Sequence, residues 1–191
     1  VGGCVPRGGG VVLSTLFLDR ILEIDERDFI AVVQPGVPTS RLQAEAEEIG
    51  LFYPPDPASV GISSIGGNAA TNAGGMRALK YGVTGDYVLG CEAVLPGGKT
   101  VRSGGRVHKD AVGLDLTSLF VGSEGTLALM TELTLKLLPR PQASASLLAE
   151  FPDQTAGLEA AAAVFRSGRL PAAVEFMDRQ AAECLRSTGA C

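Results

Sequence analysis

The residues with the clearest chemical potential form one run, residues 54–75, built from glycine, proline and small polar side chains. Two glycine pairs, Gly66-Gly67 and Gly74-Gly75, lie within this run. Glycine adopts positive φ readily and lets another molecule approach the main chain closely, and successive exposed N–H groups form a concavity that binds anions. The run therefore predicts a phosphate or pyrophosphate site, with further donors available from Ser63, Ser64, Asn68, Thr71 and Asn72.

A solvent loop is the simpler interpretation of any single glycine pair, but several polar-glycine clusters between apolar segments favour a ligand. The 191 residues include 16 basic and 21 acidic side chains, for a net charge of −5. Such a chain, with no basic stripe, is a poor nucleic-acid binder. A bound anion must be held by backbone N–H groups, helix N-termini and local cations. Arg77 and Lys80 are either those cations or part of a solvated turn.

Metal binding is not predicted from the cysteine and histidine content. Cys4, Cys91, Cys184 and Cys191 are far apart and form no C-x-x-C motif, so reduced thiols are expected rather than a zinc or iron–sulfur site. The one histidine, His108, is expected in an exposed loop. The chain is 46% hydrophobic and 19% charged, which is typical of a well-packed globular protein. It contains no apolar run long enough to span a bilayer, and a secretory leader is not expected.

Apolar periodicity and turn residues predict the elements that position the run. Strands are expected at residues 11–13, 21–24, 29–33, 87–95, 99–102 and 126–138, with tight turns at 25–28 and 96–98. Helices are expected at 115–120 and at 39–49, where Thr39 or Ser40 could cap the start and Gly50 the end. Beyond Pro141 the pattern changes, and it predicts strands at 147–151 and 173–176 and helices at 155–166 and 178–186. These elements predict an α+β fold around a mostly antiparallel sheet.

Three motifs together resemble the FAD-linked oxidases: the run 54–75, Tyr81-Gly82, and the segment Gly122-Ser123-Glu124-Gly125-Thr126-Leu127. The chain is similar in particular to the glycolate oxidase FAD subunit and D-lactate dehydrogenase branch, within the vanillyl-alcohol oxidase type of fold. The resemblance covers Val1 to about Leu185. Two departures, Leu114 in place of an aromatic residue and Ala128 in place of glycine, leave the FAD prediction intact.

The resemblance implies two domains. Residues 1–140 would be an FAD-binding type-4 domain that lacks its first lobe, and residues 141–191 would begin an α+β cap domain that binds substrate. The chain is therefore expected to be a fragment. FAD would be held non-covalently, and the catalytic base and metal ligands would come from the later cap domain, so neither is assigned here.

The resemblance also implies which residues contact FAD. Asp56 is not expected to face the phosphates, because like charges repel, and its carboxylate should accept nearby backbone N–H groups in an Asx-turn. Glu124 either holds its loop in a similar way or is a solvated carboxylate. The predicted cofactor-binding residues are Pro55, Asp56, Pro57, Ala58, Ser59, Ser63, Ser64, Ile65, Gly66, Gly67, Asn68, Ala70, Thr71, Asn72, Ala73, Gly74, Gly75, Tyr81, Gly82, Gly122, Ser123, Glu124, Gly125, Thr126 and Met130.

The activity that the resemblance implies is FAD-dependent oxidation of a small 2-hydroxy acid, glycolate or D-lactate, by hydride transfer to flavin N5. Electrons would pass to a partner protein subunit or a quinone, and an NAD site is disfavoured because no G-x-G-x-x-G motif follows a strand. Two alternatives are an enzyme like alkyl-glycerone-phosphate synthase on the same scaffold, and a non-catalytic fragment unable to hold FAD alone. The protein is expected in the cytoplasm, free or peripheral to the membrane, with neither a transmembrane segment nor a nucleic-acid partner.

Overall fold

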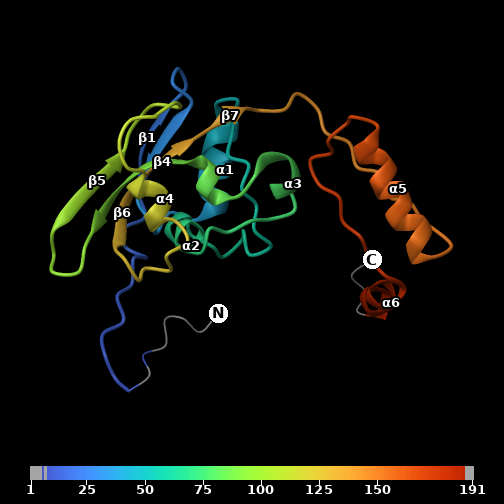
Figure 1. The fold of residues 1–191 in the computed structure, drawn as a ribbon, viewed down its shortest axis with the longest axis horizontal. Coiled ribbons are helices and arrows are strands. Elements are labelled where there is room, and N and C mark those ends of the chain that lie inside the picture. The colour runs from blue at the N-terminus through green and yellow to red at the C-terminus, as the bar shows by residue number, and fades with distance from the viewer. Residues whose placement is uncertain (1–5, 7, 188–191) are drawn as a thin grey trace.

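A five-stranded antiparallel sheet is the centre of the structure, which is a computed structural model that describes residue 6 and residues 8–187. The strand order is β1-β2-β6-β4-β5 (Figure 1). The predicted hairpins are confirmed, because β1 pairs with β2 and β4 with β5, and β6 lies between the two hairpins. The α+β class is therefore confirmed, with strands β1 Ile21–Asp25, β2 Ile30–Val33, β4 Val88–Val94, β5 Thr100–Gly104 and β6 Leu129–Lys136.

Apolar and polar side chains alternate along β6, which separates a buried face of the sheet from a more polar one. On β6, Leu133 and Leu135 are fully buried, whereas Glu132 is partly exposed on the opposite face. The neighbouring β2 continues the buried face, since Ala31 pairs with Leu135 and Val33 pairs with Leu133. The hydrophobic core therefore lies on one side of the sheet.

Short helices cover this buried face. The core includes Leu42 and Ala46 from α1 (Thr39–Glu48), Ile65 and Ala69 from α2 (Ile65–Thr71), and Phe120 from α4 (Leu116–Phe120). Two further short elements, α3 (Ala78–Tyr81) and η1 (Thr84–Tyr87), lead from α2 into β4. A separate two-stranded sheet pairs β3 (Leu51–Phe52) with β7 (Leu138–Pro139).

Helix α1 is confirmed, but its predicted cap is wrong. The N-cap residue is Pro38, and the fully buried Thr39 uses its hydroxyl in a 2.9 Å hydrogen bond with the Ser63 hydroxyl. Thr39 is buried in the core, where its hydroxyl bonds to Ser63, so it does not cap the helix. Gly50, at φ 77°, follows the helix as predicted.

Beyond β7 the chain leaves the sheet and forms α5 (Gln154–Arg166) and α6 (Arg179–Ser187), which lie away from it (Figure 1). Both helices were predicted. The strands predicted at 147–151, 173–176 and 11–13 are wrong, because none of these segments is in a ladder. A strand needs a neighbour to satisfy its backbone groups, and no described residue pairs with them.

Candidate functional site

The run 54–75 forms a loop, helix α2 and a turn, and the sequence pattern does not predict this helix. Helix α2 forms despite its two glycines because Ser64 caps it, accepting a 3.2 Å hydrogen bond from the Gly67 N–H at Oγ. The Ile65 N–H donates to the Val37 carbonyl over 2.9 Å, and the Gly66 N–H donates to the Pro35 carbonyl over 2.7 Å. The expectation of exposed amides at Gly66-Gly67 is therefore wrong, since the fold itself uses them.

Several side chains expected to reach a ligand are also used inside the fold. Asn68 is 3% exposed, and its Nδ2 donates to the Thr39 hydroxyl over 2.8 Å. The Thr71 hydroxyl donates to the Gly67 carbonyl over 3.0 Å, and Ser63 is bonded to Thr39. Asn68 and Ser63 connect this segment to Thr39 of α1, and Thr71 bonds within α2, so any ligand contact in the run falls mainly to its backbone.

The two ends of the run are joined by Asp56 and Arg77. One oxygen of Asp56, Oδ1, accepts the backbone N–H of Arg77 over 3.1 Å, and Oδ2 lies 3.1 Å from the Arg77 Nε. The guanidinium also lies over the Phe52 ring, 5.1 Å from its centroid. The predicted local Asx-turn at Asp56 is therefore wrong, because its partner lies 21 positions further along the chain. Arg77 is neither a solvated turn residue nor an uncommitted phosphate cation.

The glycines of the run differ in whether the fold requires them. A Cβ on Gly66 would lie 2.4 Å from the Pro35 Cβ, and one on Gly75 would lie 2.1 Å from the Asp56 carbonyl oxygen. Gly67 and Gly74 have neither positive φ nor such a clash, since their nearest neighbours would lie 3.2 and 3.5 Å away. Glycine inside a helix costs up to about 1 kcal/mol relative to alanine, so Gly67 has no structural explanation in this fold.

Free backbone donors lie at the end of the run. The N–H groups of Gly74, Gly75 and Met76 donate to no residue that the structure describes. They follow one another, which is the arrangement that forms an anion-binding concavity. The predicted phosphate site is therefore best matched at residues 74–76, after α2, rather than at its first glycine pair.

The second motif lies against α2. The Gly122 N–H donates to the Ala69 carbonyl over 2.9 Å, and the Glu124 N–H donates to the Ala70 carbonyl over 2.8 Å. These bonds satisfy the last carbonyls of α2, which a helix leaves unpaired. Of the two alternatives for the Glu124 carboxylate, the structure agrees with the solvated one: the backbone of Glu124 holds the loop, and its side chain is exposed with no hydrogen bond to a described residue.

One side chain of the second motif lacks a partner. The Ser123 Oγ is buried and bonds to no described residue, whereas the Thr126 hydroxyl donates to the Ser123 carbonyl over 2.6 Å. Beside the motif is a hollow of about 200 Å³. It is lined by Asn72, Val83, Gly85, Asp86, Ser118 and Val121. The Asn72 Oδ1 accepts the Gly85 N–H over 2.8 Å and so forms part of its wall.

The remaining predicted residues divide by exposure. Ala58, Ser59 and Gly125 are exposed, and Ala70 and Ala73 are partly exposed. Others are structural: Tyr81 packs edge-on against Phe52, a Cβ on Gly82 would clash with the Asp86 carboxylate, and Met130 is in the core. Tyr81 and Gly82 are partly exposed, whereas Met130, Pro55, Pro57 and Ile65 are buried and can support a ligand site but offer it little surface.

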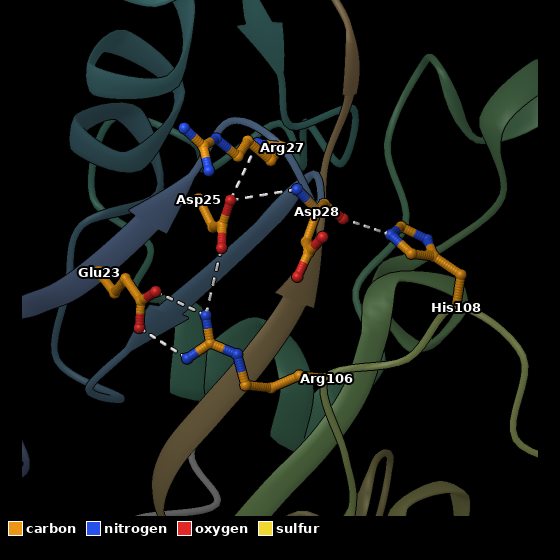
Figure 2. Close-up of polar contacts among 6 residues, drawn as sticks. All are labelled: Glu23, Asp25, Arg27, Asp28, Arg106 and His108. Carbon is orange, nitrogen blue, oxygen red and sulfur yellow. Dashed lines mark hydrogen bonds and ion pairs between the residues drawn. The ribbon is translucent and has the colours of Figure 1, made fainter.

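A cluster of polar side chains joins the loop after β5 to residues about 80 positions earlier in the chain (Figure 2). The Arg106 Nη1 donates to Glu23 over 2.6 Å, and its guanidinium also reaches Asp25. The hydrogen bond from Arg106 holds the pKa of Glu23 below its ordinary value. His108 is exposed, as predicted, and its Nε2 lies 2.6 Å from the Asp28 carbonyl oxygen. The cluster tethers this loop to the β1–β2 hairpin and includes no residue of the three motifs.

A larger hollow, about 360 Å³, lies on the polar face of the sheet between Arg102 and Arg106. Its arginines are paired with glutamates. The Arg102 Nη2 lies 2.7 Å from the Glu92 Oε2, and the Arg102 Nη1 lies 3.7 Å from the Glu132 Oε1. With these charges neutralised, the hollow offers no net attraction to an anion. No group of three metal-ligating side chains occurs among the described residues. Nor is any helix in the described part of the chain both long and apolar enough to cross a membrane.

Comparison with known families agrees with this geometry. Residues 1–104 match the family described as FAD binding domain, and residues 140–190 match FAD linked oxidases, C-terminal domain. The first match covers the run 54–75, with both glycine pairs and the free amides at 74–76.

Individual relatives extend the match to nearly the whole chain. The glycolate oxidase subunit GlcD of Bacillus subtilis is 49% identical over 93% of this chain, and a D-lactate dehydrogenase of Anaerostipes hadrus is 43% identical over 94%. The chain spans 38% of the length of each. A solved alkyldihydroxyacetonephosphate synthase superposes with a TM-score of 0.69 at 26% identity, covering 82% of this chain and 28% of its own. The chain therefore belongs to the FAD-binding domain family of the FAD-linked oxidases, and its cofactor is FAD.

Proposed function

We propose that this chain supplies part of the FAD site of an enzyme that oxidises a small 2-hydroxy acid, such as glycolate or D-lactate, to the 2-oxo acid. The observation that carries the proposal is the open backbone of the run. Gly67 and Gly74 lack side chains without a structural need, and three successive N–H groups follow at residues 74–76. The names of the relatives supply the substrate class, since they include a glycolate oxidase subunit and D-lactate dehydrogenases.

These residues fit FAD because its pyrophosphate needs convergent donors and close approach to the main chain. The amides of residues 74–76 would donate to the pyrophosphate, and Gly67 and Gly74 would let it lie against the backbone. Asp56, Asn68 and Met130 are buried, and we assign them to support of the site rather than to direct contact.

The wider assignment follows the same family. Bound FAD supplies the acceptor for the hydrogen and two electrons removed from the α-carbon of the acid. We propose that residues 1–140 belong to the FAD-binding domain and that residues 141–191 begin the substrate domain, which would contribute the catalytic base. The flavin would be held non-covalently, and a protein subunit or a quinone would reoxidise it.

A second candidate is an exchange reaction like that of an alkyldihydroxyacetonephosphate synthase. The structural similarity to such a synthase favours it, at a TM-score of 0.69. Its 26% identity to this chain is well below the 49% of the glycolate oxidase subunit, which favours the oxidation of a hydroxy acid.

The test is to purify the intact protein and record its visible spectrum, its flavin content after denaturation, and its reduction of a dye. The proposal predicts a yellow protein that releases FAD and reduces the dye with glycolate or D-lactate. A colourless protein with no releasable flavin would overturn it. A yellow protein that is inactive on both acids but forms an alkyldihydroxyacetonephosphate would favour the synthase.

A further inference from the structure

We propose that Asp56 and Arg77 are positioning residues of the FAD site, which close residues 56–77 into a loop and hold the amides of 74–76 toward the cofactor. This inference rests on the proposed function. It assigns Arg77 a role different from that of a phosphate ligand, although arginine near a predicted phosphate site would ordinarily be given that role. Its guanidinium is already occupied on two sides.

The contact between the two residues has two points. The Asp56 Oδ1 accepts the Arg77 backbone N–H, and the Asp56 Oδ2 faces the Arg77 Nε, each over 3.1 Å. One carboxylate therefore fixes both the main chain and the side chain of Arg77. The Asp56 side chain is 9% exposed and that of Arg77 is 37% exposed, so solvent screens the pair less than it would screen a surface ion pair.

This contact holds the free amides, because they have few other restraints. On one side, the Ala73 N–H donates to the Asn68 carbonyl over 2.8 Å. On the other side, the chain is held by Arg77. Between them, no N–H of residues 74–76 bonds to a described residue. The backbone of Gly75 lies directly on Asp56, since a Cβ there would be 2.1 Å from the Asp56 carbonyl oxygen.

Both partners are anchored to the fold. The Gln43 Nε2 donates to the Pro55 carbonyl over 2.8 Å and so fixes the residue before Asp56. Arg77 stacks on Phe52, which packs edge-on against Tyr81 with ring centroids 5.6 Å apart. The Asp56–Arg77 contact is therefore fixed relative to β3 and α1, and it holds the free amides in place relative to these elements.

Because of their opposite charges, substituting Arg77 and substituting Asp56 should affect FAD binding to different extents. Arg77 neutralises a buried carboxylate close to the proposed pyrophosphate. Removing only Arg77 would leave that carboxylate unpaired, which both destabilises a buried site and repels the cofactor. Removing only the charge of Asp56 leaves an acceptor for the Arg77 N–H and frees a cation, so it should weaken FAD binding less.

The experiment is to titrate FAD into the intact apoprotein as wild type, R77Q, D56N and the double variant D56N/R77Q, following the quenching of flavin fluorescence. R77Q should raise the FAD dissociation constant on the order of tenfold or more, as when preorganisation of a binding loop is lost. D56N should have a smaller effect. The double variant should recover part of the loss, because no unpaired buried charge remains and the Asn side chain still accepts the backbone N–H.

The outcomes distinguish failure of the proposed function from failure of the positioning role. A wild-type protein that does not bind FAD contradicts the proposed function itself. Wild-type affinity in all three variants contradicts the positioning role alone. If R77Q does not fold, the double variant still tests the inference: it should fold and bind FAD, because it contains no unpaired buried carboxylate. A double variant that does neither would contradict the role of charge neutralisation.

Discussion

The backbone N–H of Glu124 donates to the carbonyl of Ala70 over 2.8 Å, and this bond joins two glycine-rich motifs that are far apart in the sequence. Glu124 has φ 52°, in the left-handed region that costs residues with a side chain about 1–2 kcal/mol. The turn therefore accepts an unfavourable conformation to satisfy the end of α2. The two motifs are therefore held against each other.

Replacing Glu124 by glycine should raise the free energy of unfolding by up to about 1 kcal/mol, because glycine adopts this conformation without the steric cost. Urea denaturation of the apoprotein measures the change. Glu150→Gly is the matched control, since Glu150 is exposed and has no positive φ, and it should leave stability unchanged or lower it through the unfolded chain. Equal effects of the two substitutions would contradict the account of the turn.

The two glycines of the first pair should respond differently to alanine. Gly66→Ala should destabilise the fold by about 1–3 kcal/mol, because its Cβ would overlap Pro35. Gly67→Ala should leave stability unchanged or raise it by up to about 1 kcal/mol, since alanine favours the helix. Thermal unfolding of the two apoproteins tests the difference, and a destabilisation of the same size in both would show that Gly67 is structural after all.

Burial raises the pKa of the Cys91 thiol to about 11, whereas Cys184 is exposed. With Cys4 and Cys191 replaced by serine, a thiol reagent at pH 8 should modify Cys184 rapidly and Cys91 only on unfolding. Because the pKa is raised in the folded state, its contribution to stability is complete below the ordinary thiol pKa. That contribution is lost as the pH rises through about 11. Rapid labelling of both cysteines in the folded protein would contradict this burial.

The Arg106 contact should be visible in the titration of Glu23. Arg106 holds the pKa of Glu23 below its ordinary value, so Arg106→Gln should move this pKa upward, toward that value. Carboxyl chemical shifts followed by NMR against pH measure it, with Arg102→Gln as the control because Arg102 pairs with Glu92 and Glu132 instead. No upward shift in Arg106→Gln, or the same shift in both variants, would contradict the specific pairing.

Periodicity and turn residues predict the strands and both hairpins of the sheet, but not the position of β6 between the two hairpins. In β6 the alternation around Leu133 and Leu135 sets which face is buried, and turn residues set both hairpins. The pattern was insufficient for segments 147–151 and 173–176, whose residues favour strands but have no pairing partner among the described residues. Strand propensity describes a fit to a neighbour, and one segment alone cannot supply that neighbour.

The candidate site could be located from the sequence, but its contacts could not. Composition located the run 54–75 but not which of its amides are free, because that depends on contacts with distant residues. Thr39 and Pro35 bond the polar groups around α2, and Arg77 bonds Asp56 across the run. The one sequence signal for α2 is Ser64, a residue type that favours the N-cap of a helix. The two glycines that follow disfavour a helix, so this signal alone does not predict α2.

The most direct measurement is the FAD affinity of intact apoprotein carrying Gly74→Ala, compared with Gly61→Ala. Both glycines lack positive φ, and a Cβ would meet open space at Gly61 and no atom closer than 3.5 Å at Gly74. We expect Gly74→Ala to fold about as well as wild type yet to raise the FAD dissociation constant about tenfold or more, equal to about 1.4 kcal/mol, while Gly61→Ala leaves it unchanged. Wild-type affinity for FAD in Gly74→Ala would contradict the claim that this open backbone receives the cofactor.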